Sequence, residues 1–411
     1  MKILKKILAA IAVLTALLCI LILLCALNPN ITKKLASLVS GKASSKQTQQ
    51  EEAAKPGEME DFLPGEEAQE PDSGKEQEGL PEQEEDQPAE EPATEDWGVN
   101  LTPSDNGSSQ EVVRGTNGYE VPSESGIQVP EAVSGKSGYQ PITEKSEELP
   151  DAEGGEYTSD LGYGQLGDGY SFDPAFYPYY AMLDAKGQHL YRQIFANANA
   201  FNGAFVPIEA VPVSEIKNAI MAVYNDHPEL FWLNTAFVCK YDKNKICAEL
   251  ELEFNITQEE FPEKSSQFYN TVNTMLTQVQ NLSTYEKGRR IHDLLLEKIE
   301  YVKGADMNQS AYSALVEGKS VCAGYARAYQ YLMQRLGIPC YYCTGFAGED
   351  HAWNIIGLDD GYYNVDVTWD DTPGGEYDYF NKTDEDYADT HVRRDLSINL
   401  PKCEGQKYRN L

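Results

Sequence analysis

The sequence of 411 residues is poor in basic side chains. It has 33 Lys and Arg against 66 Asp and Glu, which gives a formal net charge of -33 at pH 7. Proteins that bind nucleic acids need positive charge against the phosphate backbone. No basic stripe with interleaved aromatic residues occurs in the sequence, so a nucleic acid is excluded as a partner.

Metal-binding motifs are missing as well. Cys340 and Cys343 form a C-x-x-C pair, but no second pair of ligands accompanies them to complete a zinc site. We therefore predict no metal and no cofactor. The acidic residues near the C-terminus lack EF-hand spacing and are interpreted as solvated turns; they are Asp359, Asp360, Asp370, Asp371, Glu376 and Asp378. The histidines without a partner pattern, interpreted as caps or surface residues, are His189, His227, His292 and His391.

The negative charge is concentrated in one segment. Residues 51–160 hold 31 Asp and Glu against 5 Lys and Arg. This region is rich in Glu, Pro, Gly, Ser and Gln and cannot bury enough apolar surface to offset the entropy lost on ordering. We predict an acidic disordered linker over residues 28–165, with order beginning near Tyr170. Within the linker, residues 113–119 and 133–139 both read V-x-G-x-x-G-Y, which indicates either a short docking motif or drift after duplication.

One long apolar run stands at the N-terminus. Lysines occupy three of the first six positions, and residues 7–27 follow as 21 residues with Thr15 as the one polar side chain. A helix needs about 20 apolar residues to cross a bilayer. We predict a cytoplasmic segment 1–6, a retained signal anchor 7–27, and a single-pass protein of the cell membrane whose C-terminal domain is extracellular. A cleavable signal peptide is the competing interpretation, although residues 25–27 are a poor cleavage site.

The eight cysteines leave the disulfide pattern open. Two lie in the apolar run and six in the C-terminal half. In an exported domain, Cys239 and Cys247 could be joined across a hairpin, and Cys403 could be joined to Cys340 or Cys343. The alternative is that these cysteines are buried free thiols.

The pattern after residue 166 changes from helices to strands along the chain. Residues 247–254 alternate apolar and acidic side chains, as in a strand with one face on a core. Elements appear in the order expected of an α+β fold, with an N-terminal α/β extension over 166–282 and a catalytic core over 283–411. Helices are predicted at 188–201, at 214–226 with Ser214 as N-cap, at 258–281, and at 285–300 with a capping box of Ser283 and Glu286.

Cys322 is predicted to lie in the first turn of a helix. The apolar spacing of residues 320–336 predicts a helix with Ser320 as N-cap, and Gly337 and Pro339 end it. In a first turn the unpaired backbone N–H groups and the helix dipole favour a thiolate over a thiol and can stabilise an oxyanion. Taken alone, a cysteine near a helix start is more often a small buried side chain.

His351 and Asp366 are predicted to share one face of a β-hairpin. Residues 351–358 and 362–369 read as its strands around an Asp-Asp-Gly turn. A loop of two or four residues puts both side chains on one face, whereas a three-residue loop would separate them. With that geometry Cys322, His351 and Asp366 form a catalytic triad of nucleophile, base and orienting carboxylate. Asp370 and Asp371 are alternative carboxylates, interpreted as turn residues.

The motifs around these residues resemble the transglutaminase-like superfamily as found in bacterial surface proteins. The motifs are residues 321–328, 337–339, 351–354 and 363–370, and flanking similarity extends to 226–232 and 377–381. The resemblance implies a papain-like core in which the nucleophile begins a helix packed on an antiparallel sheet. It also implies an acyl-enzyme on Cys322, resolved by an amine or by water. The family's remaining oxyanion donor comes from upstream of the nucleophile, where Tyr301, Asn308 and Gln309 are candidates.

Two functions from different classes follow from these observations. The first is an extracytoplasmic, membrane-anchored thiol enzyme that acts on proteins, peptides or cell-wall amides as a cross-linking enzyme, peptidase or amidase. The second is a non-catalytic binding or assembly module that uses the same fold on the cell surface. The triad favours the enzyme, whereas a blocked cleft or a bridged Cys322 would favour the module.

Overall fold

The computed structural model describes residues 114–135, 137–150, 159–373 and 375–411. The predicted membrane anchor at 7–27 and most of the predicted linker lie outside these residues. Within the described part of the chain, no helix combines the length and the apolar character that crossing a bilayer requires.

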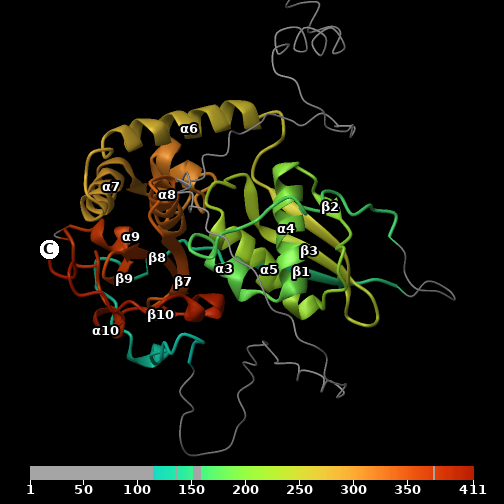
Figure 1. Cartoon of the computed structure of the whole chain (residues 1–411), viewed down its shortest axis with the longest axis horizontal. Helices are drawn as coiled ribbons and strands as arrows, with labels where there is room; N and C mark the ends of the chain where they lie inside the picture. Colours follow the sequence, from blue (N-terminus) through green and yellow to red (C-terminus); the bar gives the residue numbers. More distant parts are fainter. Residues whose placement is uncertain (1–113, 136, 151–158, 374) are drawn as a thin grey trace, which may run out of the picture. The chain divides into compact units, whose positions relative to one another are not determined.

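The N-terminal part of the described chain is a four-stranded sheet with helices packed on it (Figure 1). The strand order is β1-β3-β4-β2, in which β3 and β4 form an antiparallel hairpin and β1 runs parallel to β3. β4 matches the predicted strand residue for residue, with Leu250 and Leu252 buried in the core, although Glu249 is buried as well. The elements are β1 (Thr143–Glu148), α3 (Pro178–Met182), α4 (Ala185–Asn199), β2 (Ala204–Phe205), α5 (Val213–Asp226), β3 (Leu233–Tyr241) and β4 (Cys247–Phe254).

The predicted disordered linker is too long at its C-terminal end. β1 pairs in continuous register with β3, from Thr143 opposite Ala236 to Glu148 opposite Tyr241. Upstream of β1, Tyr119 and Ile142 are buried in the folded domain. The polar composition of the segment wrongly predicts disorder for β1, because this strand does not need to bury a hydrophobic core of its own. It adds to the edge of an existing sheet, where main-chain hydrogen bonds stabilise an acidic strand.

The C-terminal part is an antiparallel sheet with the nucleophile's helix packed on one face. The strand order is β10-β7-β8-β9, and α8 packs on β7 and β8 (Figure 1). This arrangement is the predicted α+β architecture. The elements are α6 (Phe261–Thr277), α7 (Thr284–Lys298), β5 (Glu300–Tyr301), β6 (Lys319–Ser320), α8 (Cys322–Arg335), β7 (Cys340–Phe346), β8 (Asp350–Leu358), β9 (Gly361–Val365), α9 (Val367–Asp370), α10 (Asp384–Tyr387) and β10 (Val392–Arg393). Single turns occur at Glu124–Gly126, Ser313–Glu317 and Asp395–Asn399.

The helix starts show which sequence signals were reliable. The capping box of Ser283 and Glu286 is present in full, because each side chain bonds the other residue's backbone N–H. The predicted N-caps Ser214 and Ser320 are wrong, since α5 begins at Val213 and α8 at Cys322. The hydroxyl of Ser320 instead donates to the carbonyl of Asn308 at 2.7 Å, so it fixes the segment that leads into α8.

All six cysteines of the described residues are buried free thiols. Cys239 and Cys247 face each other across the β3–β4 hairpin with their Sγ atoms 3.2 Å apart. Cys403 lies 3.4 Å from the guanidinium of Arg393. The free-thiol alternative therefore describes this structure.

Candidate active site

The β8–β9 hairpin brings His351 and Asp366 together. Leu358 pairs with Gly361 and Asn354 with Val365, so the loop has two residues and both site residues fall on one face, as predicted. The second strand is shorter than predicted, because it ends at Val365. Asp366 then becomes the N-cap of α9, and its Oδ1 accepts the backbone N–H groups of two residues in that helical turn at 2.9 and 3.1 Å.

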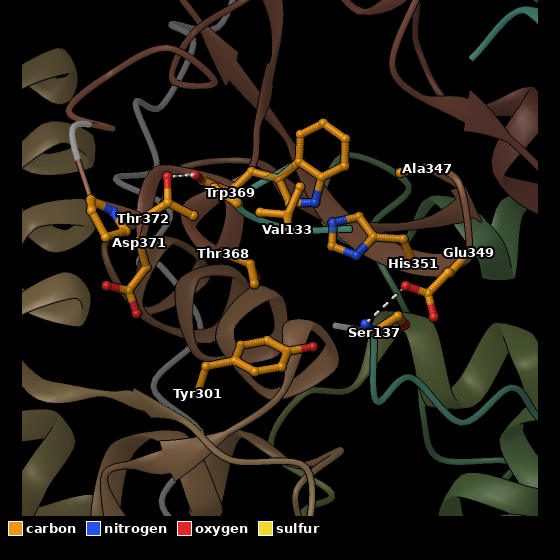
Figure 2. Close-up of a pocket in the computed structure, with 12 residues that line it drawn as sticks. Val133, Ser137, Tyr301, Ala347, Glu349, His351, Thr368, Trp369, Asp371 and Thr372 are labelled. Carbon is orange, nitrogen blue, oxygen red and sulfur yellow. Dashed lines mark hydrogen bonds between the residues drawn. The ribbon is translucent and has the colours of Figure 1, made fainter. Parts of the chain in front are cut away.

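Cys322, His351 and Asp366 lie together. The Nε2 of His351 lies 2.7 Å from the Oδ2 of Asp366, and Cys322 is close enough to His351 to raise the pKa of its imidazole. Because an imidazole has two nitrogens and Nε2 is bound to Asp366, Nδ1 is the atom that faces the thiol. Figure 2 shows His351 beside Trp369, with Tyr301 on the opposite side of the cavity. The structure therefore brings all three predicted site residues together.

The charges of the triad stabilise one another. Burial lowers the pKa of His351, but the charges of Asp366 and Cys322 and their hydrogen bonds outweigh it and raise that pKa to about 10. Burial raises the pKa of Asp366, but the charge of His351 outweighs it and holds that pKa well below its ordinary value. At neutral pH the pair is thus imidazolium and carboxylate.

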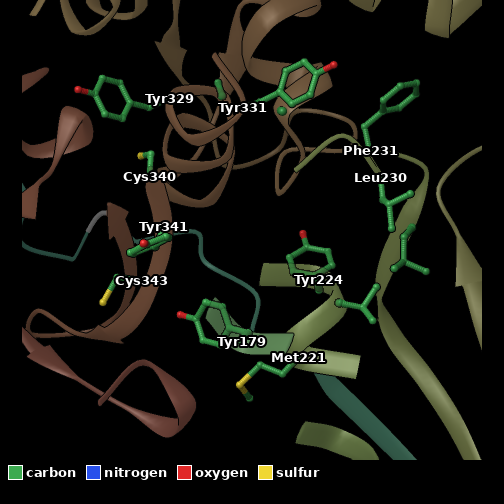
Figure 3. Packing of buried hydrophobic residues seen from close by; sticks show 14 of the residues in the cluster. Tyr179, Met221, Tyr224, Leu230, Phe231, Tyr329, Tyr331, Cys340, Tyr341 and Cys343 are labelled. Carbon is green, nitrogen blue, oxygen red and sulfur yellow. The ribbon is translucent and has the colours of Figure 1, made fainter. Parts of the chain in front are cut away.

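Arg327 fixes the nucleophile's helix to the N-terminal half of the domain. Its buried guanidinium donates to the carbonyls of Tyr224 and His227, the latter at 2.8 Å. Both carbonyls lie at the C-terminal end of α5, where a cation also meets the negative end of the helix dipole. Figure 3 shows Tyr224 and Met221 of α5 in the same core as Tyr341 of β7. The helix that begins with Cys322 is therefore held against α5 and β7 in one core.

Tyr301 is the oxyanion candidate that lies next to Cys322. Strand pairing of Tyr301 with Ser320 brings its side chain to the start of α8, where burial and the charge of Cys322 raise the pKa of its hydroxyl. The other two candidates are engaged elsewhere. Asn308 donates to the carbonyl of Lys303 at 2.5 Å, and the amide of Gln309 binds residues 138 and 140.

The sequence analysis missed His391. Its Nε2 lies 3.1 Å from the Oδ2 of Asp366, and its Nδ1 lies 2.8 Å from the hydroxyl of Thr390. The ring is buried between Trp369 and Tyr387, so the interpretation as a cap or surface residue is wrong. Burial lowers its pKa to about 4, which keeps it neutral at physiological pH. It therefore donates its Nε2 proton to Asp366.

Among the described residues, the side chains of His351, Asp366 and His391 form the one group of potential metal ligands. The ligand atoms of His351, Asp366 and His391 lie within 4.8 Å of one another. In this arrangement one carboxylate oxygen accepts from both imidazoles. A metal ion bound there would have to replace both hydrogen bonds, so the geometry fits a hydrogen-bonded group.

Replacing His391 with phenylalanine is expected to change how stability depends on pH. The pKa of His391 lies below its unfolded value of about 6.5, so the native state binds fewer protons and loses stability as pH falls from about 6 to about 4. Over this window the pKa values of Asp366 and His351 leave both charged. The difference in unfolding free energy between wild type and His391→Phe should shrink by up to about 1.4 kcal/mol per pH unit. Urea unfolding between pH 6 and pH 4 measures it, and a constant difference would contradict the assignment.

The other histidines and carboxylates form separate pairs. Asp370 is buried and accepts from the Nε2 of His292 at 3.0 Å, and Asp371 accepts from the hydroxyl of Tyr325 at 2.6 Å. These contacts correct the interpretation of both aspartates as turn residues. They also leave Asp366 as the carboxylate bound to His351. His292 is buried and caps no helix among the described residues, whereas His227 is buried but is the C-cap of α5, as the cap interpretation predicted.

A segment from the N-terminal side of the domain covers the site. Residues 129–135 and 137–141, called the covering segment below, form one wall of a cavity of about 270 Å³ whose other walls include Tyr301, His351 and Trp369 (Figure 2). The hydroxyl of Ser137 donates to the carbonyl of Asp350 at 2.5 Å. With this segment in place, Cys322 is 0% exposed and His351 is 4% exposed.

Comparison with known proteins agrees with this architecture. Residues 271–367 match the family model described as the transglutaminase-like superfamily, a range that contains Cys322, His351 and Asp366. The matched residues include α8 and the strands β7, β8 and β9, so this part of the chain is similar to the core of that superfamily. No curated protein sequence matches the chain.

Three solved structures are similar over part of their length. A protein described as a TGase is 14% identical, with 40% of this chain and 51% of that chain covered and a TM-score of 0.24. A candidate cysteine protease from Cytophaga hutchinsonii is 18% identical, with 38% and 59% covered and a TM-score of 0.24. Menin, described with a binding site for the Mixed Lineage Leukemia protein, is 23% identical, with 35% of each chain covered and a TM-score of 0.24. The chain thus spans between about a third and three fifths of these proteins.

Proposed function

We propose that the protein is a cysteine-dependent acyltransferase or hydrolase that forms an acyl-enzyme on Cys322. The observation that carries the proposal is the contact of Cys322 with His351 and of His351 with Asp366 at the start of α8. Nucleophilic catalysis needs these three groups in this order of contact. The substrates are amides, namely glutamine side chains, peptide bonds or cell-wall amides.

In the first step the Cys322 sulfur attacks the carbonyl carbon of the amide. A C–S bond forms, and the carbonyl electron pair moves onto oxygen. The backbone N–H at the start of α8 and the hydroxyl of Tyr301 then stabilise this oxyanion. His351 then gives its proton to the leaving nitrogen, the C–N bond breaks, and an amine or ammonia departs.

In the second step an amine or water attacks the thioester. His351 takes the proton from the attacking nitrogen or oxygen, the C–S bond breaks, and the Cys322 thiolate is restored. Asp366 stabilises the imidazolium in both steps, and His391 acts through Asp366 as a positioning residue by holding its carboxylate. Transfer and hydrolysis differ in the attacking molecule alone, so both remain within the proposal.

The burial of Cys322 favours a second candidate function. A non-catalytic binding module would also show a nucleophile with no exposed surface. The two candidates differ in what happens when the covering segment is displaced. An enzyme gains turnover, whereas a module does not.

The decisive experiment mixes the full-length protein with a glutaminyl peptide and a labelled primary amine. Incorporated label measures transfer, and released ammonia without incorporation measures hydrolysis. The assay is run on wild type and on Gly138→Val, which displaces the covering segment, with Cys322→Ala as the control for each. Cleavage of the peptide, followed by mass spectrometry, measures hydrolysis of a peptide bond. Absence of all three products from both proteins would contradict action on glutamine side chains and on peptide bonds.

We also propose that the enzyme works outside the cell, attached to the membrane by residues 7–27. The support is the run of 21 residues with Thr15 as its one polar side chain, preceded by Lys2, Lys5 and Lys6. The full chain should sediment with membranes and be digested by protease added to intact cells. A chain without residues 7–27 should be found in the soluble fraction. Equal distribution of the two chains would contradict the anchor.

A further inference from the structure

We propose that the covering segment occupies the place of the acyl-donor polypeptide, so that the enzyme is latent until this segment is displaced. The donor that fits is an extended peptide with a small residue followed by an aromatic residue. This inference rests on the proposed function, because it names the substrate class and the regulation of the same site. Five sets of contacts support it.

The covering segment is held by contacts to its main chain. The side-chain amide of Gln309 accepts from the backbone N–H of Gln140 at 2.9 Å and donates to the carbonyl of Gly138 at 2.9 Å. A side-chain amide that binds the main chain at positions i and i+2 acts like a neighbouring β-strand. Such contacts do not depend on side-chain identity. They are equally available to the main chain of a substrate peptide.

The segment bridges both walls of the cleft. On one wall the N–H of Ser137 donates to the carboxylate of Glu349 at 3.3 Å, next to His351 (Figure 2). On the other wall the N–H of Gly138 donates to the hydroxyl of Tyr301 at 3.3 Å. That hydroxyl is the proposed oxyanion donor. A segment bound there excludes any acyl donor from the same position.

Gly138 fits against the residue before the nucleophile. A Cβ atom at position 138 would lie 2.7 Å from the Cγ1 of Val321 and 3.2 Å from the Cγ of Lys303. Both distances are shorter than ordinary carbon contacts. A larger residue at this position cannot bind without moving the segment or the start of α8.

Tyr139 packs against small side chains around Cys322. The ring is partly buried against a cluster in which alanine predominates, and its hydroxyl end is buried, which raises the pKa of Tyr139. Small residues leave the space that an aromatic ring fills. The cluster consists of Val321, Ala323, Ala326, Tyr342 and Ala352.

The repeated sequence V-x-G-x-x-G-Y docks on the domain at both of its copies. In the first copy Tyr119 is buried with the guanidinium of Arg393 at 4.3 Å from its ring. In the second copy Tyr139 lies beside the nucleophile. Both copies use a terminal tyrosine as the anchor. This shared use favours the docking interpretation of the repeat over drift.

Replacing Gly138 with valine in the full-length protein is expected to open the site. The added atoms collide with Val321 and displace the covering segment. Alkylation of Cys322 by iodoacetamide, followed by mass spectrometry of the peptide that contains it, should be at least about 10-fold faster than in wild type. The control is Gly126→Val, because a Cβ at Gly126 meets no atom within 4 Å, and its rate should equal wild type.

Two further measurements test whether the Tyr139 ring holds the covering segment over Cys322. Tyr139→Ser removes the anchoring ring without adding bulk and should also accelerate alkylation. A synthetic peptide with the sequence of residues 129–141 should slow alkylation of the Gly138→Val protein, whereas the same peptide with serine at position 139 should not. Equal alkylation rates in wild type, Gly138→Val and Tyr139→Ser would overturn the proposal.

The outcome for latency is separate from the outcome for the proposed function. Faster alkylation without any turnover of the glutaminyl peptide would support the claim that the covering segment blocks Cys322. It would contradict the claim that the protein acts on glutamine side chains. Turnover by wild type as fast as by Gly138→Val would support the enzyme and contradict latency.

Discussion

Replacing His351 with glutamine in the Gly138→Val protein is expected to lower turnover of the glutaminyl peptide by about 10⁴-fold or more. Glutamine occupies a similar volume and can hydrogen-bond Asp366, but it cannot give a proton to the leaving nitrogen or take one from the attacking group. The loss should appear in kcat, because His351 exchanges this proton in the chemical steps. Steady-state rates of ammonia release measure it.

The matched control is His292→Gln. His292 is also buried and also paired with a carboxylate, Asp370, at 3.0 Å, but it does not contact Cys322 or His351. Turnover per folded molecule should stay within about 3-fold of the parent protein. A similar loss in both variants would mean that the effect of His351→Gln is structural, and it would contradict the assignment of His351 as the proton carrier.

Replacing Asp366 with asparagine is expected to lower turnover by about 10²- to 10⁴-fold. Oδ1 can still accept the two backbone N–H groups of α9, so the local fold is kept. The amide, however, offers no charge to hold the His351 imidazolium and turns N–H donors toward two imidazoles that now donate to Oδ2. The pH dependence of turnover should shift with the loss of charge, because Asp366 raises the pKa of His351.

The variant Asp370→Asn distinguishes the role of Asp370 from that of Asp366. Asp370 stands in the same helical turn and binds His292 and the backbone of Tyr379. If Asp366 alone orients His351, turnover of Asp370→Asn should remain close to that of the parent protein. A larger loss from Asp370→Asn than from Asp366→Asn would show that the carboxylates have been assigned in the wrong order.

Features that depend on local sequence patterns were predictable. The strand β4 and the existence of the β8–β9 hairpin follow from patterns of neighbouring residues, whereas the register depended on a loop length that the sequence left open and the structure fixes at two residues. The position of Cys322 follows from helix periodicity and from the Gly337 and Pro339 stop signals. The three residues of the site were therefore found because each stands at the end of a strongly patterned element.

Features that depend on contacts between distant segments were not predictable. His391 binds Asp366 from 25 residues away, and no spacing rule connects a lone histidine to a carboxylate through a tertiary contact. The strand β1 was not predicted for a related reason, because its stability comes from its pairing with β3. The cover over Cys322 joins residues more than 160 positions apart, although the repeated V-x-G-x-x-G-Y sequence was a signal that this region binds something.

The central claim is that an acyl group is carried on Cys322. Intact-mass spectrometry of the Gly138→Val protein, acid-quenched during reaction with a glutaminyl peptide, tests it most directly. We predict a mass increase equal to the peptide less ammonia, located on the tryptic peptide that contains Cys322 and absent from Cys322→Ala. Turnover that persists in Cys322→Ala, or an adduct on another of the cysteines, would contradict the account.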